Sequence, residues 1–157
     1  MVIGVGNVLL QDDGVGVALL ERVRAATGDD QRIEFIDGGT QGLALLGLLD
    51  GRKAALFLDA VGTGATPGTV HRIDDPLGRR FAKASTAHEG NVGELLGVAA
   101  LLGEVPDRIA VVGIEPAVVR TGLGLSSAVE SALPAATEAA CRCLDAMGSA
   151  VAEAMHA

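Results

Sequence analysis

The chain has 157 residues and a mass of 15.8 kDa, the size of one globular domain. It is 49% hydrophobic and 20% charged, with a mean hydropathy of +0.41, so it can bury a core and is not disordered. A net charge of −8 and an aromatic content of 2% exclude the basic stripe and stacking surfaces of a nucleic-acid-binding protein. The 22 glycines follow no collagen repeat and are mixed with aliphatic residues, which indicates many special backbone turns.

Neither a membrane segment nor an export signal is indicated. No apolar run reaches the ~18 residues that a spanning helix needs, and the first four residues lack the basic start of a signal peptide. Cys141 and Cys143 are two positions apart on a predicted helix, a spacing that suits neither a zinc site nor a disulfide framework. We expect a cytoplasmic protein without membrane insertion, in which both cysteines are small buried hydrophobic residues.

Apolar strand patterns alternate with helical patterns along the first half of the chain. Strands are predicted over 1–5, 32–37 and 54–59, and helices over 11–26 and 41–49. The third strand is an almost continuous apolar run, which is typical of a strand covered on both faces.

The alternation continues in the second half, with two strands and two helices predicted over 69–73, 91–102, 108–114 and 127–155. The strand 69–73 carries charge and is expected near a sheet edge. Ser127 and Glu130 have the spacing of a capping box at the start of the last helix. Gly93 and Gly97 lie four apart and predict a flat stripe for close packing of their helix.

This order of elements predicts an α/β fold with three layers: a mostly parallel sheet with helices on both faces. No repeat or linker interrupts residues 1–157, so we expect a single domain. In such sheets ligands bind beyond the carboxyl ends of the strands, and the polar residues that follow each strand are the candidates for function.

The loop after the first strand carries glycines and acids. Gly4 and Gly6 begin a dinucleotide-binding pattern, but its third glycine is replaced by Leu9, although Asp37 supplies an acid at the end of the second strand. Asp12 and Asp13 precede a predicted helix, where acids can cap free N–H groups and complement the helix dipole.

For Asp37, Asp59 and the three histidines we compare a structural role with a functional one. Asp37 precedes Gly38–Gly39 and can bond its own turn. Asp59 ends a strongly apolar strand, at the edge of the sheet where ligands bind, and a structural role explains it less well. His88 lies in a loop before a helix, whereas His71 is expected to be exposed on an edge strand and His156 belongs to the tail.

Two carboxylates and one imidazole from three strand-end loops would form a partial coordination shell. Such an oxygen and nitrogen set suits nickel, zinc or cobalt, and three protein ligands leave positions open for water or substrate. The sequence contains neither the G-x-S-x-G nor the H-E-x-x-H motif of common hydrolases. A covalent nucleophile is therefore not indicated.

At this point the chain resembles a known family, the maturation proteases of [NiFe] hydrogenases, over almost its whole length. The resemblance is carried by GVGNVLLQDDGVG, FIDGGTQG, LDAV, the His88 loop, VGIEP and GLS, at residues 4–16, 35–42, 58–61, around 88, 112–116 and 124–126. It implies a twisted five-stranded sheet between helices. Many relatives have Glu where this chain has Asp13, and most have a few more residues before the glycine motif.

The resemblance also implies a function and its residues. Asp13, Asp59 and His88 would be the catalytic residues that contact nickel, and Asp37, Gly38, Gly39 and Thr40 would shape the cleft or bind the substrate. The family removes a C-terminal extension from the nickel-loaded large-subunit precursor of a [NiFe] hydrogenase. The nickel is supplied by that substrate, no permanent metal is expected, and zinc or cadmium can substitute in crystals.

Three functions remain open at this stage. The first is the nickel-dependent endopeptidase, expected to act as a monomer on the precursor protein. The second is a nickel chaperone or sensor that uses the same three ligands without cutting a peptide. The third is a nucleotide-binding module that uses Gly4, Gly6 and Asp37.

Overall fold

The computed structural model describes residues 1–28, 30–74, 76–77 and 92–154. In this part of the chain one sheet contains five strands in the order β2-β1-β3-β5-β4. The strands are β1 (Val2–Val5), β2 (Phe35–Gly39), β3 (Ala54–Ala60), β4 (Val70–Ile73) and β5 (Arg108–Ile114). β1, β2, β3 and β5 are mutually parallel, and β4 pairs antiparallel with β5 at one edge.

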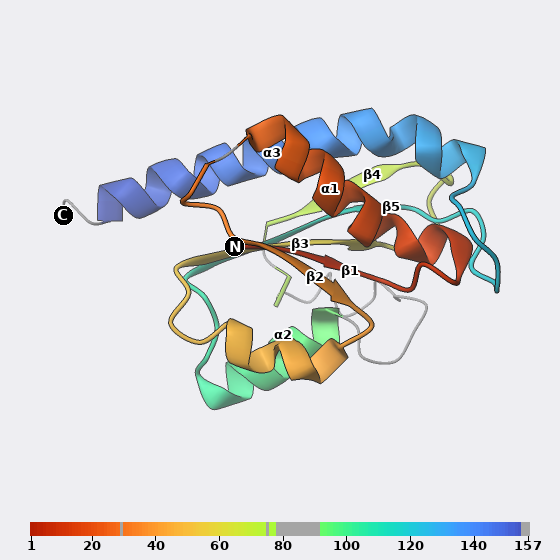
Figure 1. Cartoon of the computed structure of the whole chain (residues 1–157). Helices are drawn as coiled ribbons and strands as arrows, with labels where there is room; N and C mark the ends of the chain where they lie inside the picture. Colours follow the sequence, from red (N-terminus) through yellow and green to blue (C-terminus); the bar gives the residue numbers. More distant parts are fainter. Residues whose placement is uncertain (29, 75, 78–91, 155–157) are drawn as a thin grey trace.

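Helices cover both faces of this sheet (Figure 1). α1 (Val15–Thr27) and the long α3 (Ser127–Ala154) pack on one face, and the 3₁₀ helix η2 (Gly42–Leu48) and α2 (Val92–Leu102) pack on the other. β3 contributes Leu56 and Leu58 to the first core and Phe57 to the second, because successive side chains of a strand point to opposite faces. The predicted three-layer α/β fold is therefore confirmed. None of the described helices is long and apolar enough to cross a membrane.

Gly16 lets the start of α1 approach the sheet closely. A Cβ atom at this position would lie 2.1 Å from the Val5 carbonyl oxygen and 2.2 Å from that of Leu58. These oxygens lie at the carboxyl ends of β1 and β3, so the chain just before Gly16 is held at that end of the sheet. Gly97, in contrast, is exposed, and a Cβ atom there would meet no described atom within 4 Å, so the predicted packing stripe is wrong at this position.

Most predicted element boundaries are close to the observed ones, and β5 has the predicted limits. The second strand begins three residues later than predicted and includes Gly38 and Gly39, because Gly39 pairs with Val5 after a register shift. The first predicted helix divides into the 3₁₀ helix η1 (Gln11–Gly14) and α1.

The start of α3 corrects a second prediction. Ser126, not Ser127, occupies the capping position, because the Glu130 N–H donates to the Ser126 carbonyl at 2.9 Å. The Ser126 hydroxyl oxygen also accepts from the Val129 N–H at 3.5 Å. The predicted capping box is therefore wrong, because the residue three positions after Ser126 is Val129, which has no side-chain acceptor.

Candidate active site

The buried charged side chains gather at one end of the sheet. In the described part of the chain they are Asp12, Asp13, Asp59 and Glu115, with exposed fractions of 0%, 0%, 0% and 5%. Asp12 and Asp13 follow β1, Asp59 lies near the end of β3, and Glu115 follows β5 directly. Parallel strands bring all four to the carboxyl edge, where α/β proteins bind their ligands.

Asp59 is the penultimate residue of β3 and is fully buried. Its Oδ1 accepts a hydrogen bond of 2.7 Å from the Ala60 N–H. Strand alternation places its side chain on the same sheet face as Phe57, which is the face covered by η2 and α2. A strand of the sheet, rather than a loop, therefore fixes the position of this carboxylate.

Asp13 reaches the same edge from η1. Its Oδ2 accepts from the Asn7 N–H at 2.8 Å, and a Cβ atom on Gly6 (φ +128°) would lie 1.9 Å from the Asp13 carbonyl oxygen. η1 contacts β3, and Gly16 touches the Leu58 carbonyl immediately before Asp59. The segments that carry the two carboxylates therefore lie against each other.

The helix-capping role considered for Asp12 and Asp13 is wrong. The residue that precedes α1 is Gly14, and the described N-terminus of this helix has no side-chain cap. The third predicted ligand, His88, lies outside the described residues. Within the described part of the chain, no three His, Cys, Asp or Glu side chains are grouped to hold a metal ion, so the three-ligand site stays a prediction.

The turn after β2 lies beside the loop after β1. The Gly6 N–H donates to the Gly39 carbonyl at 2.9 Å, which joins the two segments. Asp37 is exposed and its Oδ1 accepts from the Gly39 N–H at 3.0 Å, as expected of an acid that bonds its own turn. Gly38 is buried and Thr40 is exposed. The predicted substrate-binding role of Asp37, Gly38, Gly39 and Thr40 stays a prediction.

Sequence reasoning missed the role of Asp12, whose carboxylate holds the chain after β5. It accepts four hydrogen bonds: from the N–H groups of Ala117 (2.9 Å) and Val118 (3.0 Å), and from the N–H (2.6 Å) and hydroxyl (2.8 Å) of Ser126. Burial alone would raise the pKa of Asp12, but these donors outweigh it and the pKa lies below its ordinary value. Asp12 and Asp13 are identical, adjacent residues, so the sequence alone does not show which one anchors a loop and which one belongs to the candidate site.

Glu115 was also missed, although it ends an apolar strand just as Asp59 does. Its carboxylate accepts from the N–H (2.9 and 3.0 Å) and hydroxyl (2.9 Å) of Thr63 and from the Gly64 N–H (2.9 Å). His71 Nε2 lies 2.9 Å from Oε2. Burial opposes ionisation, but the donors outweigh it and lower the pKa of Glu115. The His71 side chain is only 17% exposed, so the expectation of an exposed edge histidine is wrong.

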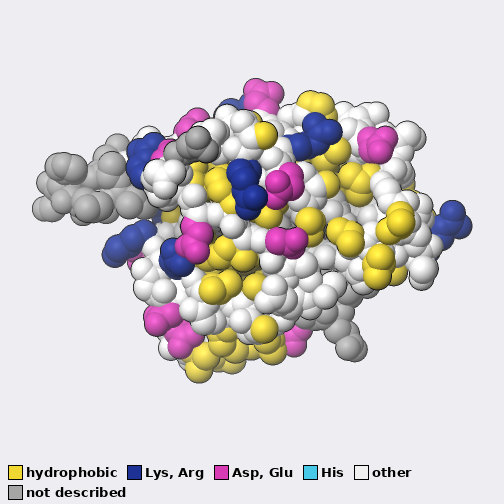
Figure 2. All heavy atoms as spheres, in the orientation of Figure 1, with side chains coloured by type: hydrophobic (Ala, Val, Ile, Leu, Met, Phe, Trp, Pro, Cys, Tyr) yellow, Lys and Arg dark blue, Asp and Glu magenta, His cyan; other side chains and the backbone are white. Residues whose placement is uncertain are grey.

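The surface of the protein has exposed apolar side chains at this edge and charged side chains of both signs. The exposed apolar side chains of Val8, Leu9 and Leu123 belong to loops after β1 and β5, which pair where the Gly122 N–H donates to the Leu9 carbonyl at 2.9 Å. On the face shown in Figure 2, acidic and basic side chains are interspersed, and apolar side chains are visible between them.

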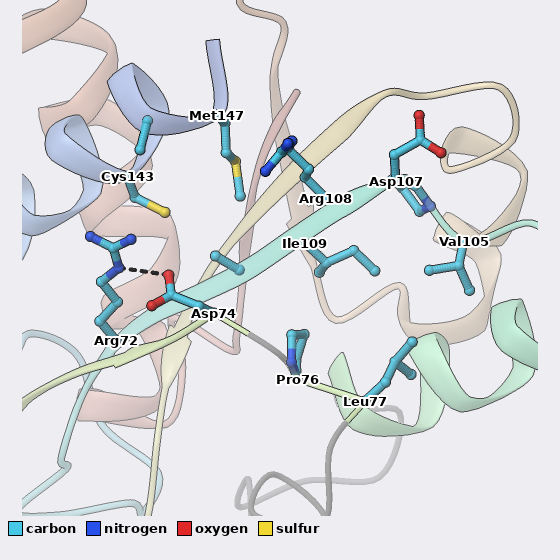
Figure 3. Close-up of a pocket in the computed structure, with 13 residues that line it drawn as sticks. Arg72, Asp74, Pro76, Leu77, Val105, Asp107, Arg108, Ile109, Cys143 and Met147 are labelled. Atoms are coloured by element: carbon cyan, nitrogen blue, oxygen red, sulfur yellow. Dashed lines mark hydrogen bonds and ion pairs between the residues drawn. The ribbon is translucent and has the colours of Figure 1, made fainter. Parts of the chain in front are cut away.

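A cavity of about 490 Å³ lies elsewhere, at the amino end of β5 (Figure 3). It is bordered by Arg72 of β4 and Asp74 just after it, by Arg108 of β5 and by Cys143 and Met147 of α3. Because β5 runs parallel to β1 and β3, its amino end is opposite to the edge that carries Asp13 and Asp59. This cavity is therefore not part of the candidate site.

Comparisons with known proteins agree with this fold. The family model described as hydrogenase maturation protease matches residues 17–143. The chain therefore belongs to the hydrogenase maturation protease family. It is 33% identical over 154 residues to the hydrogenase expression/formation protein HupD of Rhizobium leguminosarum bv. viciae, covering 96% of this chain and 76% of that protein.

Two further comparisons point to the same family. The chain is 31% identical to the hydrogenase 2 maturation protease of Escherichia coli K12, over 88% of this chain and 85% of that protein. The solved structure of the hydrogenase maturating endopeptidase HybD from E. coli has a TM-score of 0.76 and 27% identity, covering 94% of this chain and 92% of that one. With the HupD protein of Rhodobacter capsulatus, the match spans 56% of that relative's length.

Proposed function

We propose that this protein is an endopeptidase that removes a C-terminal extension from the nickel-loaded large-subunit precursor of a [NiFe] hydrogenase. The observation that carries the proposal is the pair of fully buried carboxylates, Asp13 and Asp59, on adjoining segments at the carboxyl edge of the sheet. Burying a carboxylate is costly, and one that does not anchor distant loops, as Asp12 and Glu115 do, can bind a cation or carry out chemistry. Membership of the maturation protease family supports the second use.

Recognition of nickel in the precursor follows from the donor set. The carboxylates of Asp13 and Asp59 and the imidazole of His88 would supply three ligands to the metal. The substrate would bring the metal and supply its remaining ligands. The protein itself needs no permanent metal, and zinc or cadmium would suit the same oxygen and nitrogen donors. Specificity is then the difference in affinity between loaded and empty precursor.

A carboxylate general base suits the hydrolysis better than a covalent nucleophile. Cys143 is buried and Cys141 half-buried on α3, and burial raises the pKa of both thiols, which disfavours a nucleophilic thiolate. Asp13 or Asp59 would accept a proton from a water molecule as its oxygen attacks the scissile carbonyl carbon. The proton would then pass to the leaving amine as the peptide bond breaks.

The other two functions have less support. Gly4 and Gly6 meet structural needs, since a Cβ on Gly4 would lie 2.6 Å from the Gly16 carbonyl and one on Gly6 would overlap Asp13. This explains both glycines without a nucleotide. A nickel chaperone or sensor would use the same carboxylates, so only an assay of cleavage separates it from the endopeptidase.

The test incubates the protein with purified precursor in nickel-loaded and nickel-free forms and follows the precursor mass by mass spectrometry. We expect the mass to fall by one C-terminal peptide in the loaded precursor only. A precursor that stays intact while nickel is removed from its loaded form or delivered to its nickel-free form would instead identify a chaperone. Equal cleavage of both forms would contradict recognition through nickel.

A further inference from the structure

Glu115 organises the whole connection between β3 and β4, residues 61–69. Its carboxylate accepts three hydrogen bonds from main-chain and hydroxyl groups of Thr63 and a fourth from the Gly64 N–H. Its own main chain holds the other arm of the loop, because its carbonyl accepts from the Gly68 N–H and its N–H donates to the Thr69 carbonyl, both at 2.8 Å. One residue therefore fixes the loop at both ends.

The anchor is supported from two neighbouring elements. His71 of β4 contacts the carboxylate through Nε2 at 2.9 Å. Gly68 (φ +86°) lies so close to the start of α3 that a Cβ there would be 2.7 Å from the Ala128 carbonyl oxygen. The loop is thus clamped between β4, β5 and α3.

The anchored loop leaves β3 directly after the candidate catalytic carboxylate. Thr63 and Gly64 are exposed, although the carboxylate that binds them is only 5% exposed. An exposed stretch of main chain held from below by a buried charge is rigid, and a rigid surface binds a partner without the cost of ordering a loop. Such a surface next to Asp59 is well placed to bind substrate.

We propose that Glu115 is a positioning residue that holds Thr63 and Gly64 as a preformed wall of the substrate cleft beside Asp59. The inference rests on the proposed endopeptidase function. Asp59 itself is held independently, because it pairs with Gly113 in the sheet and its neighbour Ala60 pairs with Ile114. Loss of the anchor therefore affects substrate binding, whereas the chemical step is retained.

The test measures kcat and KM for cleavage of nickel-loaded precursor by wild type, Glu115→Ala and Glu115→Gln. We expect Glu115→Ala to raise KM about 10-fold, because a loosened wall must be ordered on binding, and to change kcat by less than about 2-fold. Glu115→Gln is expected to restore KM to within about 3-fold of wild type, since its amide oxygen accepts from Thr63 and Gly64 and its NH₂ group donates to the Thr63 hydroxyl.

Val23→Ala is the matched control for a loss of stability. Val23 is fully buried in the core on α1, and truncation there destabilises the fold without touching the loop. A merely structural role for Glu115 would lower the amount of active enzyme, as in Val23→Ala, with KM unchanged, and that result would overturn the inference. If wild type leaves loaded precursor intact, the endopeptidase proposal fails, and the substrate role of the wall fails with it.

Discussion

At the scale of single residues, the hydrogen bonds of the four buried carboxylates divide them into two pairs. Asp12 and Glu115 accept from loops 51 or more positions away in the chain. Asp13 and Asp59 accept from the nearby N–H groups of Asn7 and Ala60. The first pair holds loops together, while the second lies on the segments that meet at the candidate site. All four carboxylates are buried, but two of them anchor loops and the other two are candidates for the chemistry.

Stability should decrease in acid because of the first pair. The folded-state pKa values of Asp12 and Glu115 lie below their ordinary values of 3.8 and 4.5. A lowered folded pKa stabilises the protein above the unfolded pKa, and this contribution is lost as the pH falls through the folded value. We expect the free energy of unfolding, measured with urea, to decrease below about pH 4.5 and to do so less steeply in Asp12→Asn. An equal slope in both proteins would contradict this assignment.

At the scale of elements, the start of α3 is joined to η1 through Ser126. Its hydroxyl donates to Asp12 and accepts from the Val129 N–H, whereas Ser127 is the exposed first residue of the helix. Ser126→Ala should lower the free energy of unfolding by about 1–2 kcal/mol through loss of the cap and of the bond to Asp12. Ser127→Ala is the control and should change it by less than about 0.5 kcal/mol. Denaturant titration would refute the assignment if the larger effect belonged to Ser127→Ala.

The contact between α1 and the sheet predicts opposite effects for two glycine substitutions. Gly16→Ala would force a methyl group against two main-chain oxygens, which cannot move without disturbing β1 or β3, so we expect a loss of at least about 3 kcal/mol. Gly97→Ala, on the exposed side of α2, should instead stabilise the protein by about 0.5–1 kcal/mol. Thermal melting followed by circular dichroism measures both, and a tolerated Gly16→Ala would show that this contact is not tight.

Local patterns were sufficient for the elements, but not for the contacts between distant loops. The apolar run of β5 predicted its limits, because burial on both faces leaves a continuous signal. Gly38 and Gly39 resembled a turn, yet both belong to β2, since pairing with β1 outweighs their low strand propensity. The partners of Asp12 lie more than a hundred positions away, and no local pattern indicates them. The VGIEP motif that contains Glu115 indicates a function only through its resemblance to a known family.

At the scale of the whole molecule, the parallel sheet explains why the candidate site is where it is. β1, β3 and β5 end at one edge, and all four buried carboxylates of the described residues lie there, Asp59 near the end of β3 and the others in the segments that follow β1 and β5. Two of these carboxylates, Asp12 and Glu115, join the loops through hydrogen bonds. The other two lie on adjoining segments at this edge. The exposed apolar side chains of Val8, Leu9 and Leu123, in the loops after β1 and β5, continue the same edge.

The central claim is that buried Asp59 takes part in peptide cleavage, and the rate of extension release by Asp59→Asn tests it most directly. Asparagine keeps the shape and relieves the cost of a buried charge, so the melting temperature should stay equal to or above that of wild type. Asp74→Asn, beside the distant cavity and bonded to Arg72, is the control and should cleave at the wild-type rate. With nickel-loaded precursor followed by mass spectrometry, the account predicts that Asp59→Asn releases the extension at least about 100-fold more slowly than wild type. Release at the wild-type rate by a folded Asp59→Asn protein would contradict it.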